Sequence, residues 1–503
     1  MPESYDEVLY PGYAYRQTHP DRLATMATLF GMNPAPVEAC RVLELGCGDG
    51  GNLIPMAFGL PKSQFVGIDL ARHPIEKGQA MVGTLGLENI TLRQLDLVDV
   101  SGELGQFDYI VAHGLYAWVP PVVQDKILAI AKSNLAPNGV AFVSYNAYPG
   151  GHLRTMVREM MLYHTRNLQD PDQRISQAQA LVSFLAESRT ESDAYGMFLK
   201  AELNRVLERR GEFLYHDDLA QVFAPFYFHQ FIEHAARHGL QYLAEANFSD
   251  MHAPAATPAV AQMLDGLSGG IVEKEQYLDF LKCRKLRQTL LCHREVSLDR
   301  ALKPEHMTRF HVASPAVPVS AKPDVCSEAA EEFRGAQGSG MVTAHRIAKA
   351  AIFELSELWP QSLPFQELLE RVRCRLGGAA SQDALALGEI LLRTSSAGLV
   401  ELHVHAFRFA AEAGERPVSS PLARLQLQNG AMITTLRHAR VEVEGEIERQ
   451  LLLLLDGTRD RAALLSELNA FARSSASTAS REIPPEELEN VLGKLARLAL
   501  LVA

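Results

Sequence analysis

The sequence predicts an α/β fold in which a mostly parallel sheet is covered by helices on both faces. Up to residue 146, short β-rich runs alternate with segments of helical period, as in consecutive strand-helix-strand units. The first β-rich run, residues 42–45, passes directly into a glycine-rich turn at residues 46–51. The chain has 503 residues, well above the roughly 250–300 at which a single core stops growing, so further domains are expected after the sheet.

The glycine-rich turn predicts a nucleotide-type ligand. Gly46, Gly48 and Gly51 have the G-x-G-x-x-G spacing of dinucleotide-binding turns, and glycine lets backbone amides approach the ligand closely. Two carboxylates disfavour a dinucleotide, since Glu44 precedes the glycines and Asp49 lies among them, where both would repel a pyrophosphate. S-adenosylmethionine (SAM) carries a sulfonium and an ammonium and no phosphate, so charge complementarity favours SAM over a nicotinamide dinucleotide.

Polar residues follow the next predicted strands, at the edge where parallel sheets bind ligands. Asp69 is placed to accept hydrogen bonds from both ribose hydroxyls. Asp96 would accept from the adenine amino group beside the apolar Leu97, or else it caps a turn. His113 would hold the methionine portion of SAM or relay a proton. The predicted cofactor-binding residues are Glu44, Gly46, Cys47, Gly48, Asp69, Leu70, Asp96, Leu97 and His113.

The elements around the turn extend the first domain to about residue 300. The aromatic residues 10–22 are predicted to form a capping arm on the sheet or, alternatively, a lid over the cofactor. Residues from about 152 to 215 are helical throughout and are predicted to be an insertion on the substrate side of the cleft. Late strands at 240–248 and 289–293 complete the sheet, so this domain spans 1–300. Before the insertion we expect helices at 52–59, 74–85 and 121–135, and strands at 64–68, 90–95, 107–112 and 140–146.

The composition changes after residue 300. Residues 313–340 are rich in Ala, Pro, Ser and Gly and are predicted to be a linker. Residues 341–411 hold three helical segments and an alternating run at 398–409 that predicts a β-ribbon, so this module resembles a winged helix. Residues 415–503 are predicted to form a second winged-helix-like module.

The net charge and the cysteine spacing limit the kinds of partner that the chain is expected to bind. The net charge of −12, and the acidic Asp383 and Glu389 in a candidate recognition helix, disfavour nucleic acid because phosphate binding needs clustered Lys and Arg. The six cysteines form no C-x-x-C pair and no Cys/His ligand spacing, so no metal site is predicted. The acidic chain start has no apolar core, and no apolar run approaches about 18 residues, which predicts a cytoplasmic protein without a membrane span.

Several phrases of the sequence resemble one bacterial family. They are THPDRL (18–23), ELGCGDGGN (44–52), FDYIVAHG (107–114), WVP (118–120), SYNAYPG (144–150), QYLDFL (276–281) and RQTLLCH (287–293). Over about residues 4–300 the chain resembles the class I methyltransferases that carry a methyltransferase regulatory domain, a group that includes the rickettsial-type protein lysine methyltransferases. The resemblance implies a Rossmann-like fold, SAM as methyl donor, a regulatory-type segment at about 216–300 and a lysine ε-amine as acceptor. Ala117, Ala147 and Gly151 stand where the family usually has Ser, Thr and Trp. These departures bear on the identity of the methyl acceptor and not on SAM as the donor.

With SAM as donor, the protein must position an acceptor for in-line displacement at the methyl carbon and shield it from water. A lysine acceptor must also lose its proton, which an apolar, aromatic-lined entrance favours by lowering the lysine pKa. The predicted catalytic residues are Tyr116, Trp118, Tyr145 and Tyr148 at this entrance, with Asn146 orienting the amine through its carbonyl. Ordinary core packing is the alternative for each ring. Two other functions stay open: methylation of a small molecule or a peptide natural product, and SAM binding by a regulator without turnover.

Overall fold

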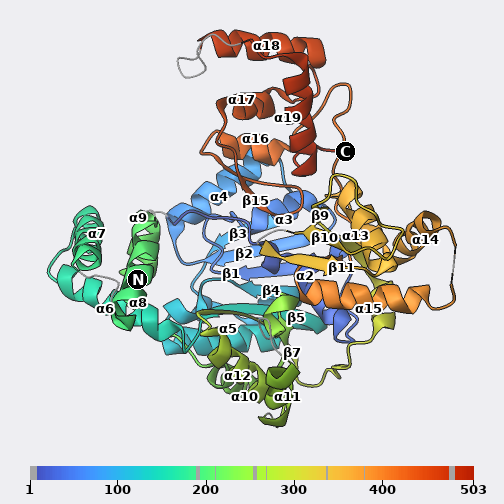
Figure 1. Ribbon diagram of the computed structural model, residues 1–503. Coiled ribbons are helices and arrows are strands. Elements are labelled where there is room, and N and C mark those ends of the chain that lie inside the picture. Colours follow the sequence, from blue (N-terminus) through green and yellow to red (C-terminus); the bar gives the residue numbers. More distant parts are fainter. Residues whose placement is uncertain are drawn as a thin grey trace.

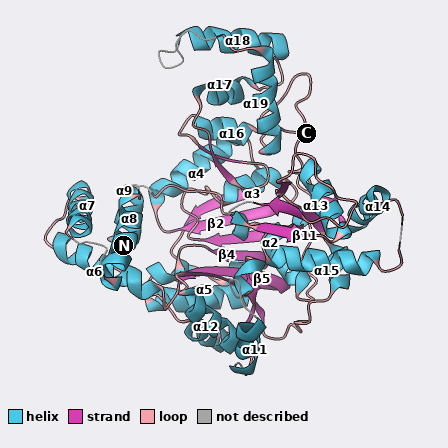
Figure 2. Cartoon of the chain, viewed as in Figure 1, coloured by secondary structure: helices cyan, strands magenta, loops and turns pink. Residues whose placement is uncertain are grey.

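A computed structural model of the chain describes residues 8, 10–188, 193–209, 211–252, 258–267, 269–335, 338–378, 380–474 and 482–503. A seven-stranded sheet lies at the centre, with helices on both of its faces (Figure 1, Figure 2). Its strands are β1 (Arg41–Leu45), β2 (Gln64–Asp69), β3 (Ile90–Gln94), β4 (Phe107–Ala112), β5 (Leu135–Asn146), β6 (Leu240–Glu245) and β7 (Leu286–His293).

The strand order is β3-β2-β1-β4-β5-β7-β6. Strands β1 to β5 pair in parallel, and Glu44 of β1 lies opposite both Gly67 of β2 and Val111 of β4. Strand β7 runs antiparallel to both β5 and β6, so β6 again points the same way as β5. Parallel pairing brings the carboxyl ends of β1, β2 and β4 to one edge, where ligands bind such sheets. The predicted α/β fold with a mostly parallel sheet is confirmed.

Side chains that alternate along the strands supply a hydrophobic core on each face. Val140 and Phe142 of β5 belong to the cluster beneath α2 and α3, whereas Ala141 and Val143 belong to the cluster beneath α5 and α10. Residues 10–19, here called the N-terminal arm, precede α2. The covering helices are α2 (Pro20–Leu29), α3 (Leu53–Gly59), α4 (Arg72–Leu85), α5 (Pro121–Asn134), α10 (Phe228–Arg237), α11 (Pro258–Leu267) and α12 (Ile271–Lys282).

The predicted helical insertion follows β5 and projects to one side of the sheet (Figure 1). It has a hydrophobic cluster of its own that includes Val157, Met161 and Leu203. Its helices are α6 (Gly151–Thr165), α7 (Pro171–Glu187), α8 (Ala194–Leu207) and α9 (Gly211–Phe213), followed by a π-helical turn at Leu214–Asp218. Short 3-10 turns lie at Arg16–Thr18, Val37–Ala39, Leu97–Asp99, Gly102–Leu104, Tyr116–Trp118, Phe248–Met251 and Pro304–Arg309.

The stretch 313–340, predicted to be a linker, is folded, and this prediction was wrong. It contains β9 (Val317–Pro318), β10 (Glu331–Arg334) and the start of β11 (Gly340–Thr343), which form an antiparallel sheet with Phe333 buried beneath it. The buried ammonium of Lys349 donates to the carbonyls of Asp324, Ser327 and Ala329 at 2.7, 2.9 and 2.6 Å. The small and proline-rich residues therefore form turns between short strands. Residues 336 and 337 of the predicted linker lie outside the described residues.

The first winged-helix-like module shares the hydrophobic cluster of the central sheet, since Val312, Leu368 and Leu391 pack into it. Its elements are α13 (Arg346–Leu358), α14 (Phe365–Leu376) and α15 (Asp383–Ser396), with β8 (His311–Ala313) between β12 (Leu363–Pro364) and β13 (Glu401–His403). The prediction of a β-ribbon at 398–409 was wrong, because β13 is the one strand among these residues. The amides of Val404 and His405 each donate to Asp21 Oδ1 at 2.9 Å, which takes the place of a second strand.

The C-terminal module stands at one end of the molecule with a hydrophobic cluster of its own (Figure 1). Its elements are α16 (Pro421–Leu427), β14 (Met432–Thr434), β15 (Arg440–Glu442), α17 (Glu446–Leu454), α18 (Arg461–Ser474) and α19 (Pro485–Arg497). Helices and a two-stranded antiparallel ribbon are the elements expected of the predicted winged-helix-like module. Within the described residues, every helix is too short or too polar to cross a bilayer.

Candidate functional site

The glycine turn closes onto the end of β2. The amides of Gly46 and Cys47 both donate to the carbonyl of Ile68, at 2.8 and 3.1 Å, which holds the turn against the neighbouring strand. Gly46 and Gly48 have φ angles of 72° and 55°, in the left-handed region that favours glycine. A Cβ on Gly48 would meet no described heavy atom within 4 Å, so the turn is open on this side. The backbone there is accessible to a ligand.

Asp69 is oriented beside the turn by two backbone amides. Its Oδ2 accepts from Gly48 at 2.8 Å and its Oδ1 accepts from Ala71 at 2.9 Å. Asp96, after β3, accepts from the amide of Val98 at 3.0 Å, so the turn cap considered as its alternative role is present. Leu97 beside it is buried, whereas Leu70 is exposed. The structure thus brings the cofactor-binding residues predicted after β1, β2 and β3 to one edge.

Glu44 is a buried carboxylate beneath the turn. Its Oε1 accepts from the side-chain amide of Asn52 at 2.7 Å, and its Oε2 has no hydrogen-bond partner in the described part of the chain. Burial, with a smaller contribution from the charges of Asp69 and Asp49, raises the pKa of Glu44 to about 8. A cation placed beside Glu44 would reverse this shift, because it stabilises the ionised form.

The N-terminal arm crosses the glycine turn. A Cβ on Gly51 would come within 2.4 Å of the Gly12 backbone, so only a glycine fits beneath the arm. The amide of Tyr15 donates to the side-chain oxygen of Asn52 at 2.9 Å, and the Tyr15 ring stacks on His113 with 3.8 Å between ring centroids. The arm therefore covers the predicted cofactor site as well as the sheet, which is the position expected of a lid.

His113 follows β4 and lies under this arm. Burial, with a smaller effect of Arg440, lowers the pKa of His113 to about 4, so the imidazole is neutral at neutral pH. A neutral ring does not repel a sulfonium, which is compatible with a contact to the methionine portion of SAM. Arg440 of the C-terminal module lies 5.2 and 5.3 Å from the ring centroids of Tyr13 and Tyr15. The C-terminal module thus reaches the arm directly above His113.

Two of the predicted catalytic tyrosines are buried. Tyr116 and Tyr145 are 0% and 1% exposed, and both pack against Phe226 and Phe231. The hydroxyl of Tyr116 lies 2.6 Å from Nδ1 of His234. Phenylalanines from the segment before β6 pack beside both rings, as in the core packing that is the alternative role of these tyrosines. Their contact with an acceptor stays a prediction.

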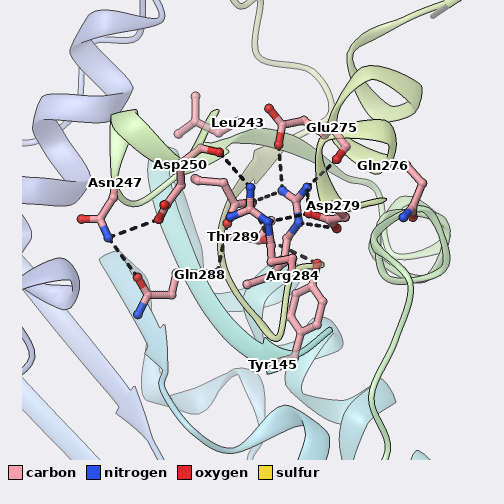
Figure 3. A network of polar contacts seen from close by, with 12 residues as sticks. Tyr145, Leu243, Asn247, Asp250, Glu275, Gln276, Asp279, Arg284, Gln288 and Thr289 are labelled. Carbon is pink, nitrogen blue, oxygen red and sulfur yellow. Dashed lines mark hydrogen bonds and ion pairs between the residues drawn. The ribbon is translucent and has the colours of Figure 1, made fainter. Parts of the chain in front are cut away.

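The hydroxyl of Tyr145 connects to a buried polar network (Figure 3). It lies 3.3 Å from the hydroxyl of Thr289, which donates to Glu245 Oε1 at 3.0 Å. The centre of the network is the fully buried guanidinium of Arg287. Arg287 forms ion pairs with Glu245, Glu275 and Asp279 at 2.6, 2.9 and 2.8 Å. The network joins β7 to β6 and α12 and fixes the hydroxyl of Tyr145.

Trp118 and Tyr148 are half-buried, on the side of the helical insertion. The Trp118 ring lies 4.8 Å from that of Phe223, and the Arg154 guanidinium lies 5.2 Å from the Trp118 ring centroid. Asn146, at the end of β5, is 8% exposed. The roles of these residues on the acceptor side stay predictions, as does the role of His113 toward the cofactor.

Sequence reasoning missed the residues that support the turn from a distance. Asn52 donates to Glu44 and its side-chain oxygen accepts from the ring nitrogen Nε2 of His438 at 3.0 Å, although 386 residues separate the two. Tyr15 completes the same cluster. The aromatic arm is a visible signal for Tyr15, whereas nothing local marks His438, which contacts the turn only because the C-terminal module folds over it.

Three protein families match successive parts of the chain. They are described as "Methyltransferase domain" over residues 36–214, "Predicted methyltransferase regulatory domain" over residues 210–293, and "PKMT, C-terminal winged helix domain" over residues 415–500. An uncharacterised protein of Rickettsia prowazekii (strain Madrid E) is 32% identical over 497 residues, which cover 97% of this chain and 89% of that protein. Another uncharacterised protein of the same organism is 39% identical over 235 residues, 46% of this chain and 94% of that protein.

A solved structure matches the whole fold. PKMT2 from Rickettsia typhi, in complex with AdoHcy, is 30% identical with a TM-score of 0.90, and the match covers 98% of this chain and 100% of that chain. The family resemblance and the methyltransferase-type sheet expected from the sequence are thereby confirmed. The chain belongs to the family of SAM-dependent class I methyltransferases that includes Rickettsia PKMT2 and combines the methyltransferase sheet with a regulatory domain and a C-terminal winged helix domain.

Proposed function

We propose that this methyltransferase transfers the methyl group of SAM to a lysine ε-amine of a protein. The observation that supports it most is the match to PKMT2 of Rickettsia typhi over the whole chain, including the winged helix domain described for PKMT proteins. That enzyme was solved with AdoHcy, which is what remains of SAM after its methyl group has left.

The charges around the glycine turn support SAM as the donor. We assign the ribose hydroxyls to Asp69, whose carboxylate direction is set by two backbone amides. The cationic methionine end faces Glu44, a buried carboxylate with one unpaired oxygen among the described residues. The neutral ring of His113 and the backbone of the turn complete this end, and Asp96 with Leu97 receives the adenine. Bound SAM supplies an electrophilic methyl carbon, and the protein supplies position and charge.

The acceptor amine approaches from the side of the helical insertion, past Trp118, Tyr148 and Asn146. A free lysine has a pKa of about 10.4, so it is almost wholly protonated at neutral pH and cannot attack. Half-buried aromatic rings exclude water from around the amine, and this desolvation lowers the pKa of the amine. The nitrogen lone pair then forms a bond to the methyl carbon as the carbon-sulfur bond breaks, and AdoHcy and one proton are released.

A tritium-transfer assay tests this proposal. The full chain is incubated with SAM labelled in its methyl group and with cell lysate, the products are separated by size, and labelled proteins are hydrolysed for amino-acid analysis. Label is expected in protein and should be recovered as methyl-lysine. Asp69→Ala should weaken SAM binding at least about tenfold, because two hydroxyl contacts are lost, and should lower labelling accordingly.

Glu389→Ala is the matched control, since Glu389 is an exposed carboxylate on α15, away from the helical insertion (Figure 1). It should leave both binding and labelling unchanged. Label confined to small molecules would replace the proposal with small-molecule or peptide methylation. Measurable SAM binding without any label would instead indicate a regulator without turnover, and unchanged SAM affinity in Asp69→Ala would remove the ribose assignment.

A further inference from the structure

Two histidines at the end of α10 converge with an aspartate of α5 on the surface between these helices. The Nε2 atoms of His234 and His238 lie 3.2 and 2.9 Å from the same oxygen, Oδ1 of Asp125. Each side chain offers one ligand atom, and the three atoms all lie within 4.8 Å of one another. We propose that Asp125, His234 and His238 form a binding site for a divalent transition-metal cation, with Zn²⁺ as the best-matched ion.

The spacing of the ligand atoms suits this ion. His234 and His238 are four residues apart, so both rings project from one side of the helix end. In a tetrahedral Zn²⁺ site with bonds of about 2.0–2.1 Å, the ligand atoms are roughly 3.3 Å apart. The observed distances to Asp125 need only small side-chain rotations to reach that value. Two imidazoles and a carboxylate are a donor set that Zn²⁺ prefers, and water would fill the fourth position.

The surroundings prepare the ligands. The carboxylate of Asp125 lies within hydrogen-bond distance of Nε2 of both histidines, so the three ligand groups already face one another. The hydroxyl of Tyr116 lies 2.6 Å from Nδ1 of His234 and can accept a hydrogen bond from Nδ1–H, which leaves the lone pair of Nε2 for the cation. The side chain of Asp125 is 61% exposed while both histidines are less than 20% exposed, so one side of the site is open to ions from solvent.

Occupation of this site would join two parts of the enzyme. Asp125 lies on the helix that follows β4, whereas both histidines belong to the stretch 210–293 that matches the regulatory domain. Through Tyr116, the site contacts the aromatic cluster that packs Tyr145. A bound cation would therefore act as a clamp between α5 and α10 and would stabilise the support of the predicted catalytic residues.

Cobalt substitution tests the site in the full chain, prepared without a polyhistidine tag and freed of metal with EDTA. Titration with Co²⁺ should produce the visible absorption bands of a tetrahedral ion, saturating at one equivalent and lost on addition of Zn²⁺. Asp125→Asn and His238→Gln should each weaken Co²⁺ binding at least about tenfold. His164→Gln, at an exposed histidine of α6, should bind Co²⁺ as the native chain does.

A second measurement uses only the native chain, so it does not depend on whether a variant folds. In the native chain, Zn²⁺ should slow modification of His234 and His238 by diethyl pyrocarbonate, read by mass spectrometry, and should leave His164 as reactive as before. Absent tetrahedral bands, equal Co²⁺ affinity in native and His238→Gln chains, or unchanged reactivity of both histidines would each overturn the proposal. Because these readouts involve no methyl transfer, they are independent of the proposed lysine activity.

Discussion

At the residue scale, the buried carboxylate of Glu44 should couple donor binding to pH. Burial raises its pKa to about 8 in the unliganded protein, so it is mostly protonated at neutral pH and ionises as the pH rises through that value. Because the ionised form attracts a cation, the SAM affinity of the native chain should rise relative to that of Glu44→Gln, by up to about tenfold per pH unit below about pH 8. Calorimetric titrations of both chains across this range measure the ratio, in which the titration of SAM itself cancels.

The same shift acts on folding. An exposed glutamate, as in the unfolded chain, has a pKa of about 4.3. Between this value and the folded value of about 8, the folded state binds more protons than the unfolded state does. Its contribution to stability is therefore present at about pH 4 and is lost as the pH rises through about 8. Glu44→Gln should lack this loss. The matched control Glu76→Gln, at an exposed residue of α4, should change neither the affinity ratio nor the thermal midpoint, and a native chain that behaves like Glu44→Gln at every pH would contradict the role of Glu44.

These residues show how far local sequence reaches. Gly46, Gly48 and Asp69 are predictable because one strand-turn-helix-strand unit fixes their relation, and its glycine and carboxylate spacing is written within 24 residues. The raised pKa of Glu44 is not predictable in this way, since it depends on burial in the folded chain, which outweighs the lowering effect of the hydrogen bond from Asn52. The His-x-x-x-His spacing at His234 is visible in the chain, but its partner Asp125 becomes a neighbour only through the packing of α5 on α10.

At the element scale, Arg287 should hold β7 in the sheet. Its buried guanidinium pairs with Glu245, Glu275 and Asp279, and Arg287→Leu would leave these carboxylates without their cation, at a cost of roughly 3–5 kcal/mol. Faster hydrogen exchange in residues 286–293 and a lower thermal midpoint are expected. The difference should shrink at acidic pH, because burial already raises the pKa of Glu275 to about 7 and a protonated carboxyl needs no cation.

Arg393→Leu is the matched control for this cluster. Arg393 pairs with Glu389 one turn earlier on α15, and the two side chains are 77% and 54% exposed. Such a pair contributes at most about 0.5 kcal/mol, so its loss should leave the exchange of β7 unchanged. Equal thermal midpoints for the two variants would show that the Arg287 network does not stabilise the sheet.

Long periodic elements were predictable, and short irregular ones were not. Strands β4 and β7 and helices α4 and α5 each carry enough apolar periodicity to be found within a few residues of their ends. The sheet of β9, β10 and β11 has strands of two to four residues, too short for any period, and its composition is that of a linker. The run at 398–409 alternates like a ribbon, but Asp21 from the start of the chain binds its backbone instead.

At the scale of the whole molecule, the N-terminal arm is held between the sheet domain and both later modules. Arg16 of the arm pairs with Glu401 of the first winged-helix-like module, and Arg437 of the C-terminal module pairs with the same carboxylate at 2.6 Å. Arg440 lies over the rings of Tyr13 and Tyr15. Residues that are far apart in the chain thus fix the arm over the glycine turn, and the C-terminal module supports the predicted cofactor site through the arm.

His438 tests this arrangement, because it contacts Asn52, which follows the turn and donates to Glu44. Burial lowers its pKa well below the usual value, so the neutral ring donates from Nε2 to Asn52. His438→Asn should weaken AdoHcy binding about three- to tenfold, the loss of one buried hydrogen bond, while asparagine still tolerates the φ of 56° found there. His345→Asn, at an exposed histidine, should bind AdoHcy as the native chain does. If calorimetry gave His438→Asn the native affinity, the C-terminal module would be packed against the turn without acting on it.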